Sequence, residues 1–357
     1  MPTAPSQSLP AWATDGAYSA PGEPWNGQPR VNSSGLSAFA AAGLTPELPT
    51  NAEQLNAWLA LAREHIEYRY RTPVVTLFGH GMDFAVTIGA GVTTLTADMH
   101  AETLVVQSGG ELRTNGYRVF ARTSITVDVG GIISCDGNPG GLPSGATAGT
   151  AGAARAAGTL AATVAGGPGG AVGVAGVQGP GVTYALGREG GDGGTRSGNA
   201  GGTGGIVVAP TVANGGSATV PLAGGQAMNR LGHLLQAING RALDGTLFTG
   251  GAGGGGGGGD AATQGGGGGG AGGGVMSLWA PMIANNGIIR AVGGNGAAPA
   301  SGGGGGGGGG GAIIRGAVYG SITGSGTWSV AGGTGGTSGG NPSGANGTAG
   351  HFYTYEV

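Results

Sequence analysis

Three blocks of the sequence consist almost entirely of glycine. They span residues 250–259, 265–274 and 302–311, and Ala252 and Ala271 are the only other residues within them. A glycine segment has no side chain to bury, and ordering each residue costs roughly 1–2 kcal/mol of backbone entropy. Only backbone hydrogen bonds, worth about 0.5–1.5 kcal/mol each, remain to hold such a segment. The fold must therefore pack these blocks backbone against backbone.

A polyproline-II-type helix meets this requirement, because its three residues per turn direct every N–H and C=O outward to a neighbour. At a rise near 3.1 Å per residue, each block gives a rod of about 31 Å. Equal block lengths predict parallel rods in one layer, with Ala252 and Ala271 at an outer surface. The looser stretches 166–176, 187–205 and 332–340 are predicted to supply outer rods or loops. A flexible glycine linker is the alternative.

Composition excludes several other classes. Glycine and proline number 91 and 18 of 357 residues, but only 9% of residues are charged and the net charge is −3, unlike a disordered chain. Glycine does not recur at every third position, as collagen requires. The nearly balanced charge gives no indication of a basic surface for binding nucleic acid. The single cysteine, Cys135, excludes an intrachain disulfide framework.

The N-terminus has neither the basic nor the apolar region of a secretory signal, so we expect synthesis in a cytoplasm without export. No apolar window reaches about 18 residues, so no membrane insertion is expected. Residues 1–49 carry isolated aromatic side chains among Pro, Ser, Ala and Gly, which predicts an extended docking arm.

Residues 50–72 have the pattern of one short helix. Thr50 and Glu53 form a capping box, and Pro73 ends the pattern. The helix either packs on its own domain or bundles with copies of itself. Its apolar face is formed by Leu55, Trp58, Leu59, Ala62 and Ile66.

Residues 73–140 change to a period of two, with short runs rich in Val, Ile and Thr. Asn115-Gly116 is a strong turn signal. Strands this short and evenly spaced predict a β-sandwich or a β-solenoid. Residues 141–249 form a glycine- and alanine-rich region with short strands, and 250–357 a polyglycine-rod layer with interleaved β rungs. The predicted fold class is thus mainly β with polyglycine-II helices.

An internal repeat supports a sheet or solenoid interrupted by a long glycine-rich insertion. Its shared core is Gly-Ile-Ile at 131–133 and 287–289, and Gly326 takes the place of the glycine in a third copy. The copies read TVDVGGIISCDGNPG at 126–140, MIANNGIIRAVGGNG at 282–296 and, more weakly, ITGSGTWSVAGGTGG at 322–336.

Catalytic and metal-binding patterns are sparse. His80 with Asp83, and Asp98 with His100, form two loose pairs that are more typical of ordinary surface residues than of metal ligands. Paired carboxylates for glycan cleavage need a cleft, and acidic residues are few after residue 140. We therefore expect no enzyme activity, no cofactor and no metal.

Several segments carry a resemblance to one family. The opening Trp-Ala-Thr-Asp at 12–15, with the helix LNAWLALAREHIEY at 55–68, resembles the N-terminal attachment region of bacteriophage tail-fibre and tail-associated proteins. The segment containing TNGYRVF, at 95–134, is similar to glycine-rich phage structural proteins, and the glycine blocks resemble the polyglycine sandwich of tail-fibre tip adhesins. Those adhesins attach to a separate fibre, whereas here the first 135 residues look like a docking and fibre region joined directly to the glycine part.

The resemblance implies a virion protein, homotrimeric, that binds other tail or baseplate proteins through its N-terminus. It also implies that loops between the rods contact a host surface receptor such as a glycan. Virion-docking candidates are Trp12, Asp15, Tyr18 and Trp25. Receptor-binding candidates are Asp260, Thr263, Gln264, Trp279, Tyr319, Trp328 and Tyr353. For Trp279 and Trp328, capping the ends of the glycine layer is an equal alternative.

The function expected is a phage tail-fibre or tail-tip component in host attachment. A capsid- or collar-bound fibre with a purely structural role is the main alternative. A bacterial surface matrix protein is a further one, and the missing export signal argues against it. Whether the rods pair within one chain or across three is left open by the sequence.

Overall fold

The computed structural model describes residues 77–183, 186–208, 247–338 and 342–356. All belong to the second of two compact units of the chain, Leu77–Val357. The predicted arm at 1–49 and helix at 50–72 lie outside the described residues.

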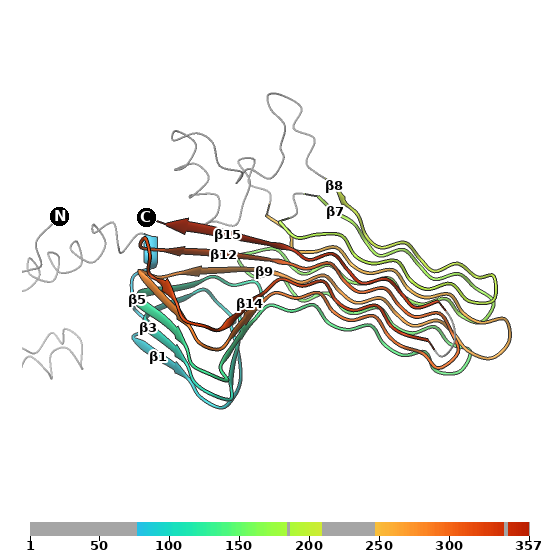
Figure 1. The fold of residues 1–357 in the computed structure, drawn as a ribbon, viewed down its shortest axis with the longest axis horizontal. Coiled ribbons are helices and arrows are strands. Elements are labelled where there is room, and N and C mark those ends of the chain that lie inside the picture. The colour runs from blue at the N-terminus through green and yellow to red at the C-terminus, as the bar shows by residue number, and fades with distance from the viewer. Residues whose placement is uncertain (1–76, 184–185, 209–246, 339–341, 357) are drawn as a thin grey trace, which may run out of the picture. The chain divides into compact units, whose positions relative to one another are not determined.

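Two parallel sheets form one end of this unit (Figure 1). The eight-stranded sheet has the order β1-β3-β5-β9-β12-β15, and β10 and β13 branch from it at β5. Its strands are β1 (Ala85–Ile88), β3 (Met99–Val106), β5 (Val119–Val127), β9 (Val275–Trp279), β10 (Met282–Asn285), β12 (Ala312–Ala317), β13 (Ile322–Thr323) and β15 (His351–Glu356).

The second sheet has five strands in the order β14-β11-β6-β4-β2. They are β2 (Gly91–Thr94), β4 (Gly110–Arg113), β6 (Ile132–Ser134), β11 (Ile288–Arg290) and β14 (Thr327–Ser329). A separate pair joins β7 (Val182–Thr183) to β8 (Val207–Val208).

The predicted fold class is wrong, because this is neither a β-sandwich nor a solenoid or fibre. Every pair between named strands is parallel, whereas a sandwich is built from antiparallel hairpins. A solenoid stacks consecutive repeats. Here β5 pairs with β9 and β10, which follow it only after a long glycine-rich excursion. The alternating sequence pattern predicted where strands occur but not which strands pair with each other.

The Asn115-Gly116 turn illustrates the difference. Both residues have positive φ, 48° and 78°, which Asn and Gly tolerate. The turn nevertheless forms no hairpin, because β4 before it and β5 after it belong to different sheets.

Apolar side chains fill the space between the strands. Buried and less buried residues alternate along most of β3 and in the second half of β5, as a half-exposed strand requires, whereas the first three residues of β5 are all buried. β9 is buried along its whole length, so it lies in the interior on both faces. The largest side chains of the main cluster include Leu104, Leu112, Ile125 and Ile133, each without exposed surface. Burial of each such side chain stabilises the fold by about 1.5–3 kcal/mol.

The three copies of the internal repeat lie side by side. Ile132 of β6 pairs with Ile288 of β11, and Ile288 pairs with Thr327 of β14. The glycine before each of these strands is required by close backbone contact. A Cβ at Gly287, for example, would overlap the carbonyl oxygen of Gly131. The repeat is therefore a pairing unit, in which similar segments stack although they are distant in sequence.

The glycine-rich segments run out from the sheets and turn at their far end (Figure 1). In block 250–259, successive N–H groups donate in turn to three neighbours, and each neighbour is met again three residues later. Gly254 donates to Gly270, Gly255 to Gly191 and Gly256 to Val177. A period of three is the repeat of a polyproline-II-type helix.

The same block accepts hydrogen bonds from three further segments. Gly167 donates to Gly254, Gly306 to Gly255, and Gly202 to Gly256. Block 250–259 is thus surrounded by hydrogen-bonded backbone on all sides. Blocks 265–274 and 302–311 show the same arrangement, and the three blocks also bond to one another. We call this assembly the glycine bundle.

Less glycine-rich segments surround the three blocks. The positions of these segments that face the blocks are glycine, and the positions that face outward carry side chains. In segment 174–181, for example, Val174 and Val177 are exposed, whereas Gly176 and Gly179 face the block. The outer segments are 135–142, 149–155, 163–170, 174–181, 187–194, 199–206, 291–297, 330–338 and 342–350.

The predicted position of Ala252 and Ala271 is wrong, since neither has exposed surface. The blocks that contain them are interior and have neighbours on every side, so no position in them reaches the outside. Among the described residues, the backbone groups of the glycine segments find hydrogen-bond partners within one chain.

Candidate functional site

Short loops join the outgoing and returning segments at the end of the glycine bundle remote from the sheets (Figure 1). We call them the tip loops. They are residues 142–148, 171–173, 195–198, 260–264 and 298–301.

Asp260 organises the central tip loop. Its Oδ1 accepts N–H hydrogen bonds from Ala262, Thr263 and Gln264 at 3.0, 2.6 and 2.8 Å, and its Oδ2 accepts the Thr263 hydroxyl at 2.7 Å. The Gln264 N–H and these other donors hold the pKa of Asp260 well below its usual range. Its other contact is the Ser301 hydroxyl of a neighbouring tip loop, which donates to Oδ2 at 3.4 Å. The carboxylate is therefore occupied by loop contacts, which position the loops.

Neighbouring tip loops are joined to this one. The Ser301 hydroxyl donates to Oε1 of Gln264 at 2.7 Å, and the Ser301 N–H donates to the same atom at 2.8 Å. The Gly173 N–H donates to the Asp260 carbonyl, and the Asn199 amide donates to the Gly259 carbonyl. The tip is therefore a connected surface on a rigid support, which suits recognition.

The structure brings Asp260, Thr263 and Gln264 together, and Thr263 is exposed beside two exposed alanines, Ala261 and Ala262. Sequence reasoning missed Ser301 and Asn199. Their position in short polar links between glycine-rich stretches was the available signal.

The aromatic candidates lie elsewhere, at the sheet end. Trp279 has no exposed surface and donates its indole N–H to the Ser277 hydroxyl at 2.7 Å. Tyr353 is 9% exposed, in the same cluster. Tyr319 is 81% exposed in the turn after β12, and Trp328 is partly buried against the main core. The docking candidates Trp12, Asp15, Tyr18 and Trp25 lie outside the described residues.

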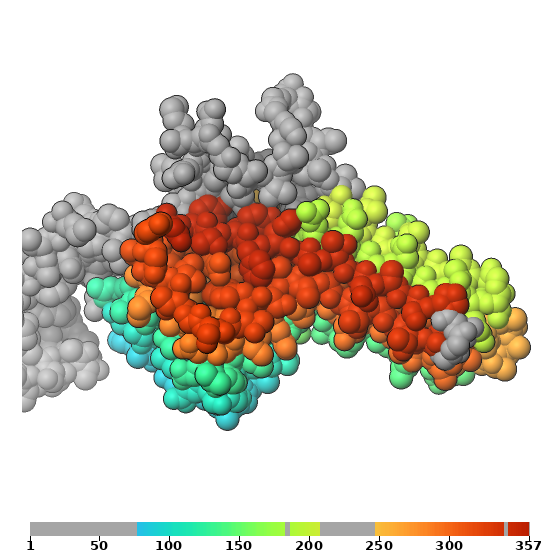
Figure 2. Space-filling view, viewed as in Figure 1, coloured from blue at the N-terminus to red at the C-terminus, as the bar shows by residue number. Residues whose placement is uncertain are grey.

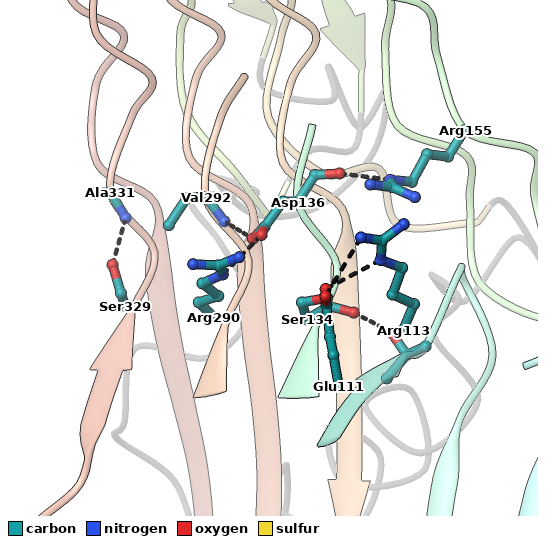
Figure 3. Close-up of polar contacts among 10 residues, drawn as sticks. Glu111, Arg113, Ser134, Asp136, Arg155, Arg290, Val292, Ser329 and Ala331 are labelled. Atoms are coloured by element: carbon teal, nitrogen blue, oxygen red, sulfur yellow. Dashed lines mark hydrogen bonds and ion pairs between the residues drawn. The ribbon is translucent and has the colours of Figure 1, made fainter. Parts of the chain in front are cut away.

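A polar cluster lies where the five-stranded sheet continues into the glycine bundle (Figure 3). Asp136 forms an ion pair with Arg290 at 2.8 Å, its Oδ1 accepts the Val292 N–H at 3.1 Å, and its carbonyl accepts the Arg155 Nε–H at 2.6 Å. Burial raises the pKa of Asp136, against the opposing effect of Arg290. The contacts join β6 to β11 and to segment 149–155.

Beside this cluster, Arg113 donates to both carboxylate oxygens of Glu111, at 3.0 and 3.3 Å, and the Ser134 hydroxyl donates to Glu111 at 2.7 Å (Figure 3). The Arg113 hydrogen bonds hold the pKa of Glu111 below its usual value. Every acid here is satisfied by a partner, so the cluster anchors the glycine bundle to the sheet.

The two histidine–aspartate pairs form no metal site. His80 stacks on His100 with ring centroids 4.0 Å apart, and His100 stacks on Phe120 at 4.8 Å. Asp98 is held by Arg118, whose Nε and Nη2 donate to it at 2.8 and 2.6 Å. Among the described residues, no group of three or more His, Cys, Asp or Glu is placed to hold a metal ion.

Comparison with known proteins gives no relative: no protein-family model, curated protein or solved structure matches the chain. Within the described ranges, no helix is long and apolar enough to cross a membrane.

Proposed function

We propose that the chain is a structural protein of a bacteriophage virion, a tail-fibre or tail-tip component that contributes to attachment to the host cell. The observation that carries the proposal is the glycine bundle with its connected tip loops. This arrangement resembles that of the phage tail-fibre tip adhesins, in which loops between glycine rods contact a receptor.

The construction of the bundle suits this role. Its interior is held by backbone hydrogen bonds from three interior blocks to segments on all sides. Side chains are not needed to hold the interior, so the tip loops are free to vary in sequence without loss of support. Rigid presentation of variable loops is the usual arrangement of recognition surfaces.

The partners proposed are tail or baseplate proteins at the N-terminus and a host surface receptor at the tip loops. A homotrimer stays a prediction. Because the glycine segments bond within one chain, trimer contacts would have to come from other surfaces. Sedimentation of the full chain measures this: a monomer contradicts the trimer while leaving the attachment role intact.

The attachment role is tested by the substitution Ala262→Arg, which adds a long side chain at an exposed tip-loop position. We expect virions carrying it to assemble normally but to adsorb to host cells at least tenfold more slowly, because the receptor contact is obstructed. The matched control is Val129→Arg, which adds the same side chain at a 75% exposed position near the sheets.

Equal adsorption of both variants and the unmodified virion would contradict a receptor contact at the tip loops. Location on the particle is a separate question. It is tested by immunogold labelling of the protein on virions, with and without residues 1–49. If the deletion removes the label from tails but not from heads, the capsid alternative is excluded.

A further inference from the structure

A second exposed surface, at the sheet end, is formed around Arg315 of β12. This residue is the single charged residue in an otherwise apolar strand, AIIRGA. Its guanidinium carbon lies 4.3 Å from the ring centroid of Trp328 and 5.9 Å from that of Phe352. Two aromatic rings therefore hold the guanidinium, and cation–π attraction favours that position.

Among the described residues, Arg315 donates a single side-chain hydrogen bond. Its Nε–H donates to the Thr354 hydroxyl at 2.9 Å. Among the described residues no carboxylate forms an ion pair with it, although Glu356 is near enough to interact electrostatically. The arginines of the other ion pairs, such as Arg118 and Arg290, each meet an acid directly.

The register of the sheet places these groups on one face. Ile313 pairs with Phe352, Arg315 with Thr354, and Ala317 with Glu356. Phe352, Thr354 and Glu356 are exposed, and β15 is the last strand on this side of the described sheet. In Figure 2 the orange-to-red atoms of this part of the chain form the surface that faces the viewer.

We propose that this surface, formed by Arg315, Trp328, Phe352 and Thr354, binds a carboxylate-bearing sugar residue of a polysaccharide. An arginine fork binds a carboxylate through two parallel hydrogen bonds. The 42% exposed ring of Phe352 offers an apolar face for the sugar ring.

Glu356 helps to define the class of ligand. As a hydrogen-bond acceptor it suits sugar hydroxyl groups, and its charge disfavours a densely charged polyphosphate close to Arg315. A single carboxylate on a hydroxylated ring fits this mixture of charges. The proposal does not rest on the virion role, because the assay measures sugar binding by the purified chain. It is also separate from the tip loops, which contribute no residue to this surface.

The test uses the full chain with tri-galacturonic acid as probe and the neutral galactose trisaccharide for comparison, measured by isothermal titration calorimetry. We expect the acidic trisaccharide to bind and the neutral one to bind at least tenfold more weakly. Arg315→Gln should lose at least tenfold in affinity for the acidic probe. Arg315→Lys should also lose affinity, because lysine keeps the charge but cannot form the paired contact.

The matched control is Arg122→Gln, which removes an arginine of similar exposure paired with Glu102 on β3. We expect its affinity to be unchanged. Thermal unfolding of each variant separates loss of the site from loss of the fold. Equal affinity for the acidic and neutral probes, or an Arg315→Gln variant that folds and binds normally, overturns the proposal. Binding of a phosphorylated trisaccharide in preference to the carboxylated one overturns it as well.

Discussion

The interior of the glycine bundle predicts a large effect for the smallest possible substitution, Gly306→Ala. A Cβ at this position would overlap the carbonyl oxygen of Gly191 and lie 2.6 Å from its carbonyl carbon. Both atoms are backbone, so no side chain can rotate away. Ordinary carbon–carbon contact is about 3.5–4.0 Å, so the segments must separate by roughly 1 Å.

That separation weakens hydrogen bonds of Gly306 to its other neighbours. Its N–H donates to Gly255 at 2.7 Å, and its carbonyl accepts the Gly270 N–H at 2.9 Å. A buried group that loses its partner costs about 1–3 kcal/mol. Two such losses lower the free energy of unfolding by about 4 kcal/mol. Alanine offsets about 0.4–1 kcal/mol of this by restricting the conformations of the unfolded chain. We expect a net loss near 3 kcal/mol, or roughly 6 °C in Tm for a unit of this size.

Differential scanning calorimetry of the full chain measures the shift. The control is Gly89→Ala, because a Cβ there meets only Oε1 of Gln107, at 3.9 Å, and φ is not positive. We expect the control to stay within about 1 kcal/mol of the unmodified protein. If Gly306→Ala unfolds at the unmodified Tm, or if both variants lose the same stability, the close packing of the bundle is refuted.

Two further predictions concern the sheet end. Arg290→Met leaves the buried Asp136 carboxylate without its ion-pair partner, which should cost about 1–3 kcal/mol at pH 7. Burial raises the pKa of Asp136 above its usual value, so its carboxylate takes up a proton at a higher pH in the folded state than in the unfolded chain. A protonated Asp136 needs no ion-pair partner, so the cost should shrink as the pH falls from 7 toward 4; Tm values at both pH values measure this, and a cost independent of pH contradicts it. Gly316→Ala should destabilise by about 1–3 kcal/mol, because a Cβ there would enter the ring of Trp279. The double variant with Trp279→Leu should recover part of that loss, and strictly additive losses in urea unfolding would contradict the contact.

The candidate site was predictable only in part. The link between two glycine blocks identified Asp260, Thr263 and Gln264, because any rod that returns needs a loop. The sequence could not show that Asp260 turns inward to bind its own loop, nor that Ser301 closes the network from another link. The aromatic ring of Trp279 indicated a receptor contact, but its complete burial depends on strands far from it in sequence.

The glycine content alone required the blocks to pack backbone against backbone, because a segment without side chains has only its N–H and C=O groups to satisfy. The sequence also indicated the β-strands and the repeated Gly-Ile-Ile unit. How these segments combine is visible only in the three-dimensional fold. Hydrogen bonds between backbone groups carry no residue identity, so nothing local specifies that 250–259 bonds to 265–274 and 302–311 within one chain, or that β5 pairs with β9 and β10 in a parallel sheet. Those choices depend on the whole chain closing around its three interior blocks.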